Sequence, residues 1–317
     1  MKSLKESPRI AAIDMGTNSF HLVIVEVEED GSLNFLDRER VVLRLGSQKG
    51  NDLSMISEDE TNRAVKILSN FSDLAKFYKA KIRAIATSAV REAKNQKDFV
   101  ETIFSKTGVN VEVIEGKDEA KLIFGGIKKA LPIKDKKVLC LDIGGGSTEF
   151  IYAENEKIIF AESVKIGAVR LSKLFFPDFI INDEAVKKCS DYVEEKIIRN
   201  KNILTNIDID FSVGVSGTVD TIFHLSKAEE FEDKNLSLNG YSFSKETLQK
   251  YYNKIIALKT PVERIAVPGM EAKRADIIPA GMIILNKIFS LFNINQMVVS
   301  EYALREGIIF DTIENIK

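Results

Sequence analysis

The sequence predicts an α/β protein built from two similar domains. A strand that runs into an Asp-x-Gly turn, followed by a hairpin and a helix, occurs twice along the chain. The two acids, Asp14 and Asp142, differ in sequence number by 142 − 14 = 128. A repeat of that length is a whole domain, since solenoid repeats span about 20–50 residues. The 317 residues are also enough for two domains of about 150 residues each.

The first half opens with an apolar strand over residues 9–13 that runs into Asp14. A second strand is predicted over residues 21–29, and Asp30-Gly31 after it is a hairpin signal. The remaining predictions for this half are an extended stretch over 32–46, a helix over 57–80, a strand over 81–90, a helix over 94–108, a strand over 109–116 and a helix over 118–131.

One helix signal is detailed enough to test residue by residue. Ser57 and Glu60 form the pattern of a capping box, in which each residue satisfies an amide of the other. Apolar residues then recur at helical spacing, and we expect Phe71, Leu74 and Phe77 to face the core.

The second half repeats the pattern. A strand leads through Asp142 into a glycine-rich turn, a hairpin turns at residues 154–156, and a long helix begins at Asn182. Residues 210–226 predict a strand, a Gly-x-Ser-Gly-Thr turn and a helix. A last strand over 296–300 precedes a closing helix over 301–316.

Composition excludes several classes of protein. The chain has 45 Lys and Arg against 47 Asp and Glu, a net charge of −2, which argues against a dedicated nucleic-acid or anionic-membrane binder. Its two cysteines and two histidines exclude a disulfide scaffold, a cysteine-rich zinc site and an HExxH site. Without an apolar leader or an apolar run of about 20 residues, we expect a cytoplasmic protein.

Two short segments carry the candidate chemistry. In the first, Asp14 ends a buried strand, and the polar turn after it offers consecutive amides and hydroxyls beside a carboxylate that could hold a cation. An ordinary hairpin turn with an Asp cap explains this segment equally well. In the second, Asp142 is followed by three glycines, which a chain accepts where its backbone must approach a ligand closely. Two such loops across a cleft would clamp a chain of phosphates, and neither is a Walker A loop or a GxGxxG fingerprint.

Residues 13–24, IDMGTNSFHLVI, and 141–150, LDIGGGSTEF, resemble the two phosphate motifs of the exopolyphosphatase/guanosine pentaphosphate phosphohydrolase (Ppx/GppA) family. That family belongs to the actin, Hsp70 and sugar-kinase superfamily. The resemblance continues through the segments IRAIATSAVREAKN, VIEGKDEAKLIFGGI, VKIGAVRL, GVSGTVDTI, RADIIPAG and SEYALREGI, so it covers nearly the whole chain. The chain resembles the short, two-domain form of the family.

The resemblance assigns roles to particular residues. The metal-binding acids are Asp14 and Asp142, which would hold Mg²⁺ or Mn²⁺. The two phosphate loops consist of Thr17, Asn18 and Ser19, and of Gly144, Gly145, Gly146 and Ser147. Arg91 would clamp phosphate, since a guanidinium forms two parallel hydrogen bonds to it, although a surface ion pair is the alternative.

The catalytic glutamate of the family matches Glu119, although Asp118 and Glu115 are close enough in sequence to compete. A helix-terminal acid favoured by the dipole is the alternative interpretation of Glu119. Glu149 matches a further acid near the metal and the water. In the Gly-x-Ser-Gly-Thr turn, Gly217 and Thr218 would face the nucleotide or the distal phosphates of a substrate, with helix capping as the alternative.

The resemblance implies two ribonuclease H-like (actin-like ATPase) domains, residues 1–125 with 303–317 and residues 126–302, with a substrate cleft between them. It implies hydrolysis of the terminal phosphoanhydride of inorganic polyphosphate. Hydrolysis of guanosine pentaphosphate to the tetraphosphate, phosphotransfer to ADP, and a non-enzymatic polyphosphate or alarmone sensor stay open. The expected partners are these phosphate compounds, with no nucleic acid and no membrane, and a homodimer is left open.

Overall fold

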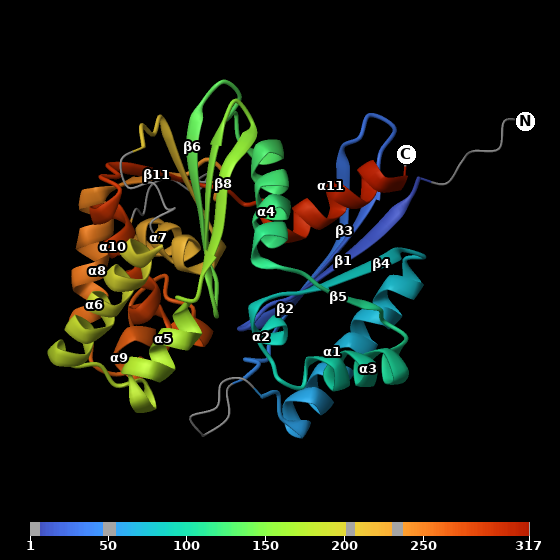
Figure 1. Ribbon diagram of the computed structural model, residues 1–317, viewed down its shortest axis with the longest axis horizontal. Helices are drawn as coiled ribbons and strands as arrows, with labels where there is room; N and C mark the ends of the chain where they lie inside the picture. Colours follow the sequence, from blue (N-terminus) through green and yellow to red (C-terminus); the bar gives the residue numbers. More distant parts are fainter. Residues whose placement is uncertain (1–6, 47–54, 201–206, 230–236, 317) are drawn as a thin grey trace, which may run out of the picture. The chain divides into compact units, whose positions relative to one another are not determined.

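The structure is a computed structural model that describes residues 7–46, 55–200, 207–229 and 237–316. The chain forms two compact units, one of Met1–Glu119 with Leu304–Lys317 and one of Ala120–Ala303. Each unit is built on one sheet with helices packed against it (Figure 1). In the described part of the chain, no helix is long and apolar enough to cross a membrane.

The first unit contains a five-stranded sheet with the order β3-β2-β1-β4-β5. Its elements are β1 (Arg9–Met15), β2 (Ser19–Val27), β3 (Leu33–Val42), α1 (Glu58–Phe77), β4 (Lys81–Ala86), α2 (Ser88–Arg91), α3 (Gln96–Thr107), β5 (Val111–Val113), the first turn of α4 (Gly116–Ala130) and α11 (Leu304–Ile316). Strands β1, β2 and β3 form an antiparallel meander, and β4 and β5 continue the sheet in parallel to β1. Helices α1 and α3 lie on one side of this sheet, and α11 packs on β1 and β2 (Figure 1).

The second unit contains a six-stranded sheet with the order β10-β11-β9-β6-β7-β8. Its elements are β6 (Lys137–Ile143), β7 (Thr148–Glu154), β8 (Lys157–Val164), α5 (Ala168–Phe175), α6 (Asp183–Arg199), β9 (Phe211–Val215), α7 (Ser216–Glu229), β10 (Ser242–Ser244), α8 (Lys245–Ala257), α9 (Pro261–Ile265), α10 (Ile278–Leu291) and β11 (Gln296–Val299). Most of α10 is buried, and the helices α5, α6 and α8 pack against it.

The repeat seen in the sequence is also a repeat of strand register. The order β8-β7-β6-β9-β11 in the second unit corresponds to β3-β2-β1-β4-β5 in the first. A β-bulge falls between Ile24 and Val25 in the first meander and between Tyr152 and Ala153 in the second, which is the same offset in sequence number as that between the two aspartates. Bulges are specific backbone features, so the two units share their detailed strand pairing.

Two predicted elements are wrong. The strand predicted over 81–90 ends at Ala86, and the last residues of that range belong to the short helix α2, which ends at Arg91. The predicted Gly-x-Ser-Gly-Thr turn does not form a separate loop. Strand β9 ends at Val215 and α7 begins at Ser216, whose φ of 70° turns the chain from the strand into the helix within one residue.

The predicted start of α1 is confirmed, since both hydrogen bonds of the capping box between Ser57 and Glu60 are present. The predicted core face is wrong at its end. Phe71 is 2% exposed, whereas Phe77 is 78% exposed. Each step of three residues turns an α-helix about 60° short of a full revolution, so Phe77 lies about 120° around the helix from Phe71.

Candidate active site

The first loop is a tight turn between β1 and β2. Asp14, the second-last residue of β1, lies opposite His21 of β2 and beside Ile85 of β4. The Gly16 N–H donates to the main-chain oxygen of Ser19 over 3.2 Å. A Cβ on Gly16 would lie only 3.2 Å from that same oxygen, which explains the glycine.

Some of the remaining polar groups of this loop already form hydrogen bonds within the protein. The main-chain oxygen of Asn18 accepts from Leu43 and Arg44, and Ser19 Oγ lies 2.8 Å from His21 Nε2. Within the described residues, the main-chain N–H groups of Thr17 and Asn18 donate no hydrogen bond. The Oδ1 atom of Asn18 is buried and likewise has no hydrogen-bond partner there. Buried polar groups normally find partners, so this loop offers two amides and a carbonyl to a ligand.

Arg91 and Glu119 are brought together in the first unit. Arg91 Nη1 donates to Glu119 Oε2 over 2.8 Å and to the main-chain oxygen of Ile114 over 2.9 Å. Their side chains are only 14% and 8% exposed. A guanidinium held at two points fixes the orientation of the carboxylate that it contacts.

The two competing acids lie in different surroundings. Glu115 and Asp118 are exposed, whereas Glu119 is buried in the first turn of α4. Among the three, Glu119 has the environment of a positioned acid. The catalytic assignment itself stays a prediction.

The second loop, between β6 and β7, repeats the turn of the first. The Gly144 N–H donates to the main-chain oxygen of Ser147 over 3.0 Å, and these two residues stand at the same offset from Gly16 and Ser19 as Asp142 does from Asp14. The carbonyls of this loop are tied to the start of α5 and to Arg170. The bonds are Ala168 N–H to Gly144 O, Val169 and Arg170 N–H to Gly145 O, and Arg170 Nε to Gly146 O.

With its carbonyls fixed, this loop presents its amides. No hydrogen bond from the main-chain N–H of Gly145, Gly146 or Ser147 occurs in the part of the chain that the structure describes. Gly167 packs directly under the loop, where a Cβ would lie 2.4 Å from the Gly145 oxygen. Sequence reasoning did not single out Gly167. Its place directly before the α5 helix, in VKIGAVRL, is the only sequence signal for it.

Two acids lie side by side in the second unit. Asp142 of β6 is directly opposite Glu149 of β7, and they are 7% and 1% exposed. Glu149 Oε1 accepts from Ser147 Oγ and Ser163 Oγ, both over 2.7 Å. Directly opposed residues of an antiparallel pair share one face of the sheet, so both carboxylates face the same side.

These residues fit a magnesium ion. No group of three or more His, Cys, Asp or Glu side chains that could hold a metal occurs among the described residues. Mg²⁺, however, is commonly held by one or two carboxylates with substrate phosphates and water completing the shell. The opposed pair Asp142 and Glu149, and separately Asp14, meet that requirement.

Gly217 and Thr218 lie in the first turn of α7, and Val215 before them is paired with Asp142. Both are buried. A Cβ on Gly217 would overlap the guanidinium of Arg274, so that cation packs on the helix start. Sequence reasoning missed Arg274, since its only signal was its place in the segment RADIIPAG.

Comparison with known proteins decides the family. The profile of the Ppx/GppA phosphatase family matches residues 23–316. The chain belongs to this family.

Solved Ppx/GppA structures are similar over almost the whole chain. An exopolyphosphatase from Cytophaga hutchinsonii is 30% identical, with a TM-score of 0.88 over 98% of this chain and 99% of that one. The Ppx/GppA family member from Aquifex aeolicus is 25% identical, with a TM-score of 0.81 over 98% of this chain and 99% of that one. The predicted fold class, two duplicated α/β domains, is thereby confirmed.

A curated relative carries a different activity in its name. The guanosine-5'-triphosphate,3'-diphosphate pyrophosphatase of Aliivibrio fischeri is 29% identical over 318 residues. The match covers all of this chain and 62% of the relative. The family is therefore one of phosphatases, within which names divide between polyphosphate and guanosine pentaphosphate.

Proposed function

We propose that this Ppx/GppA phosphatase hydrolyses the terminal phosphoanhydride bond of inorganic polyphosphate and releases orthophosphate. The observation that carries the proposal is the repeated glycine–serine turn, Gly16 to Ser19 and Gly144 to Ser147. Each turn follows a strand-end aspartate and offers amides that bind nothing else in the described residues. Such amides bind phosphate oxygens, and two sets in one chain suit a substrate with several phosphates.

The chemical roles follow from the surroundings of each side chain. Glu119, held by Arg91, would orient the attacking water and accept its proton. Arg91 would contact the terminal phosphoryl group with its remaining N–H groups. The loop amides would stabilise charge on the phosphoryl oxygens as the bond breaks. Mg²⁺ on Asp14 and Asp142 would add neutralisation of that charge.

A basic pocket beside the second loop supports a long polyanion as substrate. It has a volume of 440 Å³ and is lined by four cationic side chains, those of Lys165, Arg170, Lys196 and Arg199. Arg170 also binds Gly146 of the loop itself. Several cations in one pocket attract a substrate with several negative charges.

Guanosine pentaphosphate hydrolysis is the second candidate, favoured by the name of the Aliivibrio fischeri relative. It uses the same groups, and the two proposals differ only in what extends from the reacting phosphate. The buried Arg91–Glu119 pair favours an enzyme over a phosphate sensor, because binding alone needs no positioned acid.

The test is phosphate release from pyrophosphate, tripolyphosphate, long-chain polyphosphate and guanosine pentaphosphate, with ADP added in parallel to detect ATP formation. We expect the highest kcat/KM on long-chain polyphosphate, no ATP, and no turnover in excess EDTA. Lys196→Glu should lower kcat/KM on long chains more than on tripolyphosphate. Lys188→Glu, on α6 outside the pocket and paired with Glu184, is the matched control. Preference for guanosine pentaphosphate would replace this proposal by the second candidate.

A further inference from the structure

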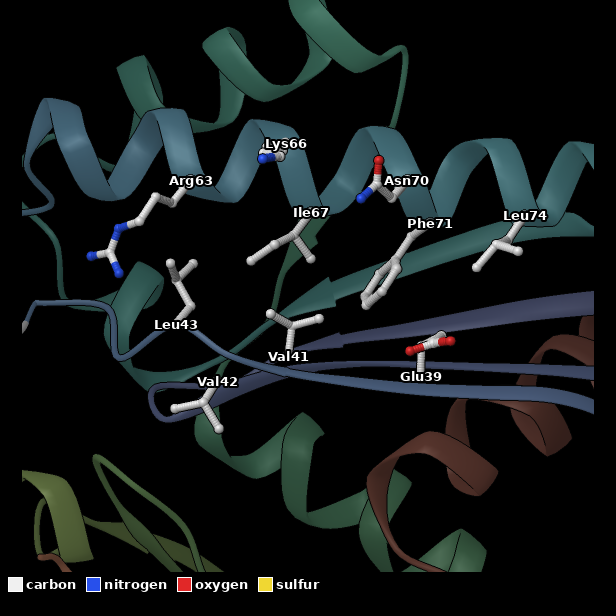
Figure 2. Close-up of a pocket in the computed structure, with 10 residues that line it drawn as sticks. All are labelled: Glu39, Val41, Val42, Leu43, Arg63, Lys66, Ile67, Asn70, Phe71 and Leu74. Atoms are coloured by element: carbon white, nitrogen blue, oxygen red, sulfur yellow. The ribbon is translucent and has the colours of Figure 1, made fainter. Parts of the chain in front are cut away.

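A groove in the first unit lies between helix α1 and the edge strand β3, and the proposed reaction gives it no role (Figure 2). Its volume is 540 Å³. Ligand sites typically have volumes of about 300–1,000 Å³. Helix α1 packs on β2 and β4, so the groove opens at the outer part of the sheet, beside β3. The chemistry of its two walls decides which ligand fits.

The strand wall of the groove changes from polar to apolar along its length. Glu39, Val41 and Leu43 face α1, because alternate residues of an extended chain share one face. Figure 2 shows Val41 pointing from β3 toward the helix. Glu39 is exposed, Val41 is partly buried and Leu43 is buried. Four steps of about 3.4 Å separate the first from the last, so this wall is about 14 Å long.

The helix wall supplies an apolar floor and a polar rim. The lining residues of α1 recur at steps of three and four residues, so they form a single stripe on the helix. Half of them are exposed and polar, and the other half are apolar and at least partly buried. The polar residues are Arg63, Lys66 and Asn70, and the apolar residues are Ile67, Phe71 and Leu74.

The floor has apolar surface that a ligand can cover. Val41, Ile67 and Leu74 pack against the core of the first unit but are only partly buried. Figure 2 shows Phe71 pointing from α1 toward β3, between the other floor residues. Binding energy from apolar contact grows with the apolar area removed from water. A long and narrow apolar floor therefore favours an elongated apolar tail.

The rim attracts one acidic group. Arg63 and Lys66 are three residues apart on α1, so their side chains are neighbours on the helix surface. Arg63 pairs with Asp59 over 3.0 Å, but the two side chains are 48% and 72% exposed. Exposed ion pairs of this kind are weak, so a ligand carboxylate can compete with Asp59. Lys66 forms no ion pair with the described residues.

The opposite end of the groove rejects a second negative charge. In Figure 2, Arg63 lies toward the Leu43 end of the strand wall, and Glu39 lies at the other end. A ligand with acidic groups at both ends would place one of them beside Glu39. A polyphosphate chain would also bring charged groups onto the apolar floor, where loss of water costs free energy. The groove is therefore unsuited to the proposed substrate.

We propose that this groove binds an amphipathic monoanion with the chemistry of a medium-chain fatty acid. The carboxylate lies beside Arg63 and Lys66 at the rim. The unbranched tail extends over Val41, Ile67 and Phe71 toward the Glu39 end. A few polar groups that fix the orientation of a ligand on an apolar surface are typical of small-molecule sites.

Isothermal titration calorimetry on the full chain tests this proposal with decanoate, octanoate, decylammonium and decanedioate. Octanoate has two methylene groups fewer, and it should bind about tenfold more weakly than decanoate. Decylammonium and decanedioate should each bind at least about tenfold more weakly than decanoate. The rim cations repel the first, and the second places a carboxylate beside Glu39. Tripolyphosphate should not displace decanoate.

Protein variants separate the rim from the floor. Arg63→Glu with Lys66→Glu should weaken decanoate at least about tenfold and abolish its advantage over decylammonium. Val41→Phe fills the groove with a residue that strands accept, and it should abolish decanoate binding while thermal melting shows a folded protein. Lys76→Glu, exposed on the same helix outside the groove, is the matched control. Methyl NMR signals of Val41 and Ile67 should shift on addition of decanoate.

Each contrary outcome overturns the proposal in a recognisable way. Equal affinity for decanoate and decylammonium would show apolar contact without a site for an acid. Displacement of decanoate by tripolyphosphate would show that the rim cations bind phosphate instead. Dimerisation of the wild-type chain in sedimentation that is lost in Val41→Phe would identify a second copy as the occupant. Absence of decanoate binding at millimolar concentration would show that the groove takes no fatty acid.

Discussion

The substitution Gly167→Ala tests whether the position of the second phosphate loop governs activity. Gly167 has φ −140°, a backbone conformation that alanine adopts without strain. The difficulty is contact, because the new Cβ would lie 2.4 Å from the Gly145 oxygen and 2.5 Å from the carbonyl carbon of Gly146. Ordinary contacts begin at 3.4 Å, so the loop must move by about 1 Å.

A shift of that size has a large expected effect on rate. Misplacement of a reacting group by about 1 Å can lower the rate about 10²-fold. The crowding should also cost about 1–3 kcal/mol of stability, as overpacking does elsewhere. We therefore expect kcat for phosphate release to fall about 100-fold while the protein stays folded.

The assay is steady-state phosphate release together with thermal melting. The control is Gly125→Ala in α4, where a new Cβ meets nothing within 4 Å. It should leave kcat unchanged and stabilise the helix slightly. If Gly167→Ala keeps wild-type kcat and KM, then the second phosphate loop does not bind the reacting phosphates. That result would refute the part of the proposed site that this loop forms.

The remaining predictions concern single side chains. Glu119→Gln should lower the rate of single-turnover phosphate release about 10²–10⁴-fold while substrate binding is retained, whereas Glu115→Gln should have little effect. The opposite result would assign the general base to Glu115. Arg264→Leu should lower the free energy of unfolding by about 3–5 kcal/mol in a urea titration, because it leaves without a donor the three main-chain carbonyls that the fully buried guanidinium binds, and an unsatisfied buried group costs about 1–3 kcal/mol; a loss below about 1 kcal/mol would contradict this. Hydrogen bonds from Lys250 and a second lysine lower the pKa of Glu229 from 4.5 to about 2. The ionised Glu229 therefore stabilises the fold above pH 4.5, and this contribution is lost as the pH falls toward 2. Glu229→Gln should cost about 1 kcal/mol at pH 7, and unfolding titrations should show the difference from wild type shrinking below pH 4.5.

The sequence predicted those parts of the fold that local chemistry specifies. The capping box at Ser57 and the Asp-x-Gly turns are local patterns, and the structure has them where they were expected. The constant offset between the two halves located both loops, because a duplicated domain keeps its strand register. The residues that pair across the sheet with Asp14 and Asp142 follow from the same offset.

The parts that could not be predicted depend on contacts between distant segments. Gly167 is required because the start of α5 packs against the second loop, and the β7–β8 hairpin separates the two in sequence. Arg274 packs on Gly217, although helices α8 and α9 lie between them in the chain. The pairing of Arg91 with Glu119 likewise joins α2 to α4. The helical periodicity of α1 predicted which side of the helix is buried but not how far around the helix the buried side extends. Phe77 was therefore predicted to lie in the core, although it is exposed.

The duplication also explains how one backbone geometry can serve two chemical tasks. Both turns close with the same hydrogen bond from glycine to serine, but the residues between differ, Thr17 and Asn18 in the first and two glycines in the second. The residue opposite the aspartate also differs, since His21 faces Asp14 where Glu149 faces Asp142. The first turn therefore adds side-chain hydrogen-bonding groups, and the second adds bare amides and a second carboxylate. Because Mg²⁺ prefers oxygen ligands that carry charge, the cation is expected to depend more on the second turn, whereas both turns present amides to phosphate oxygens.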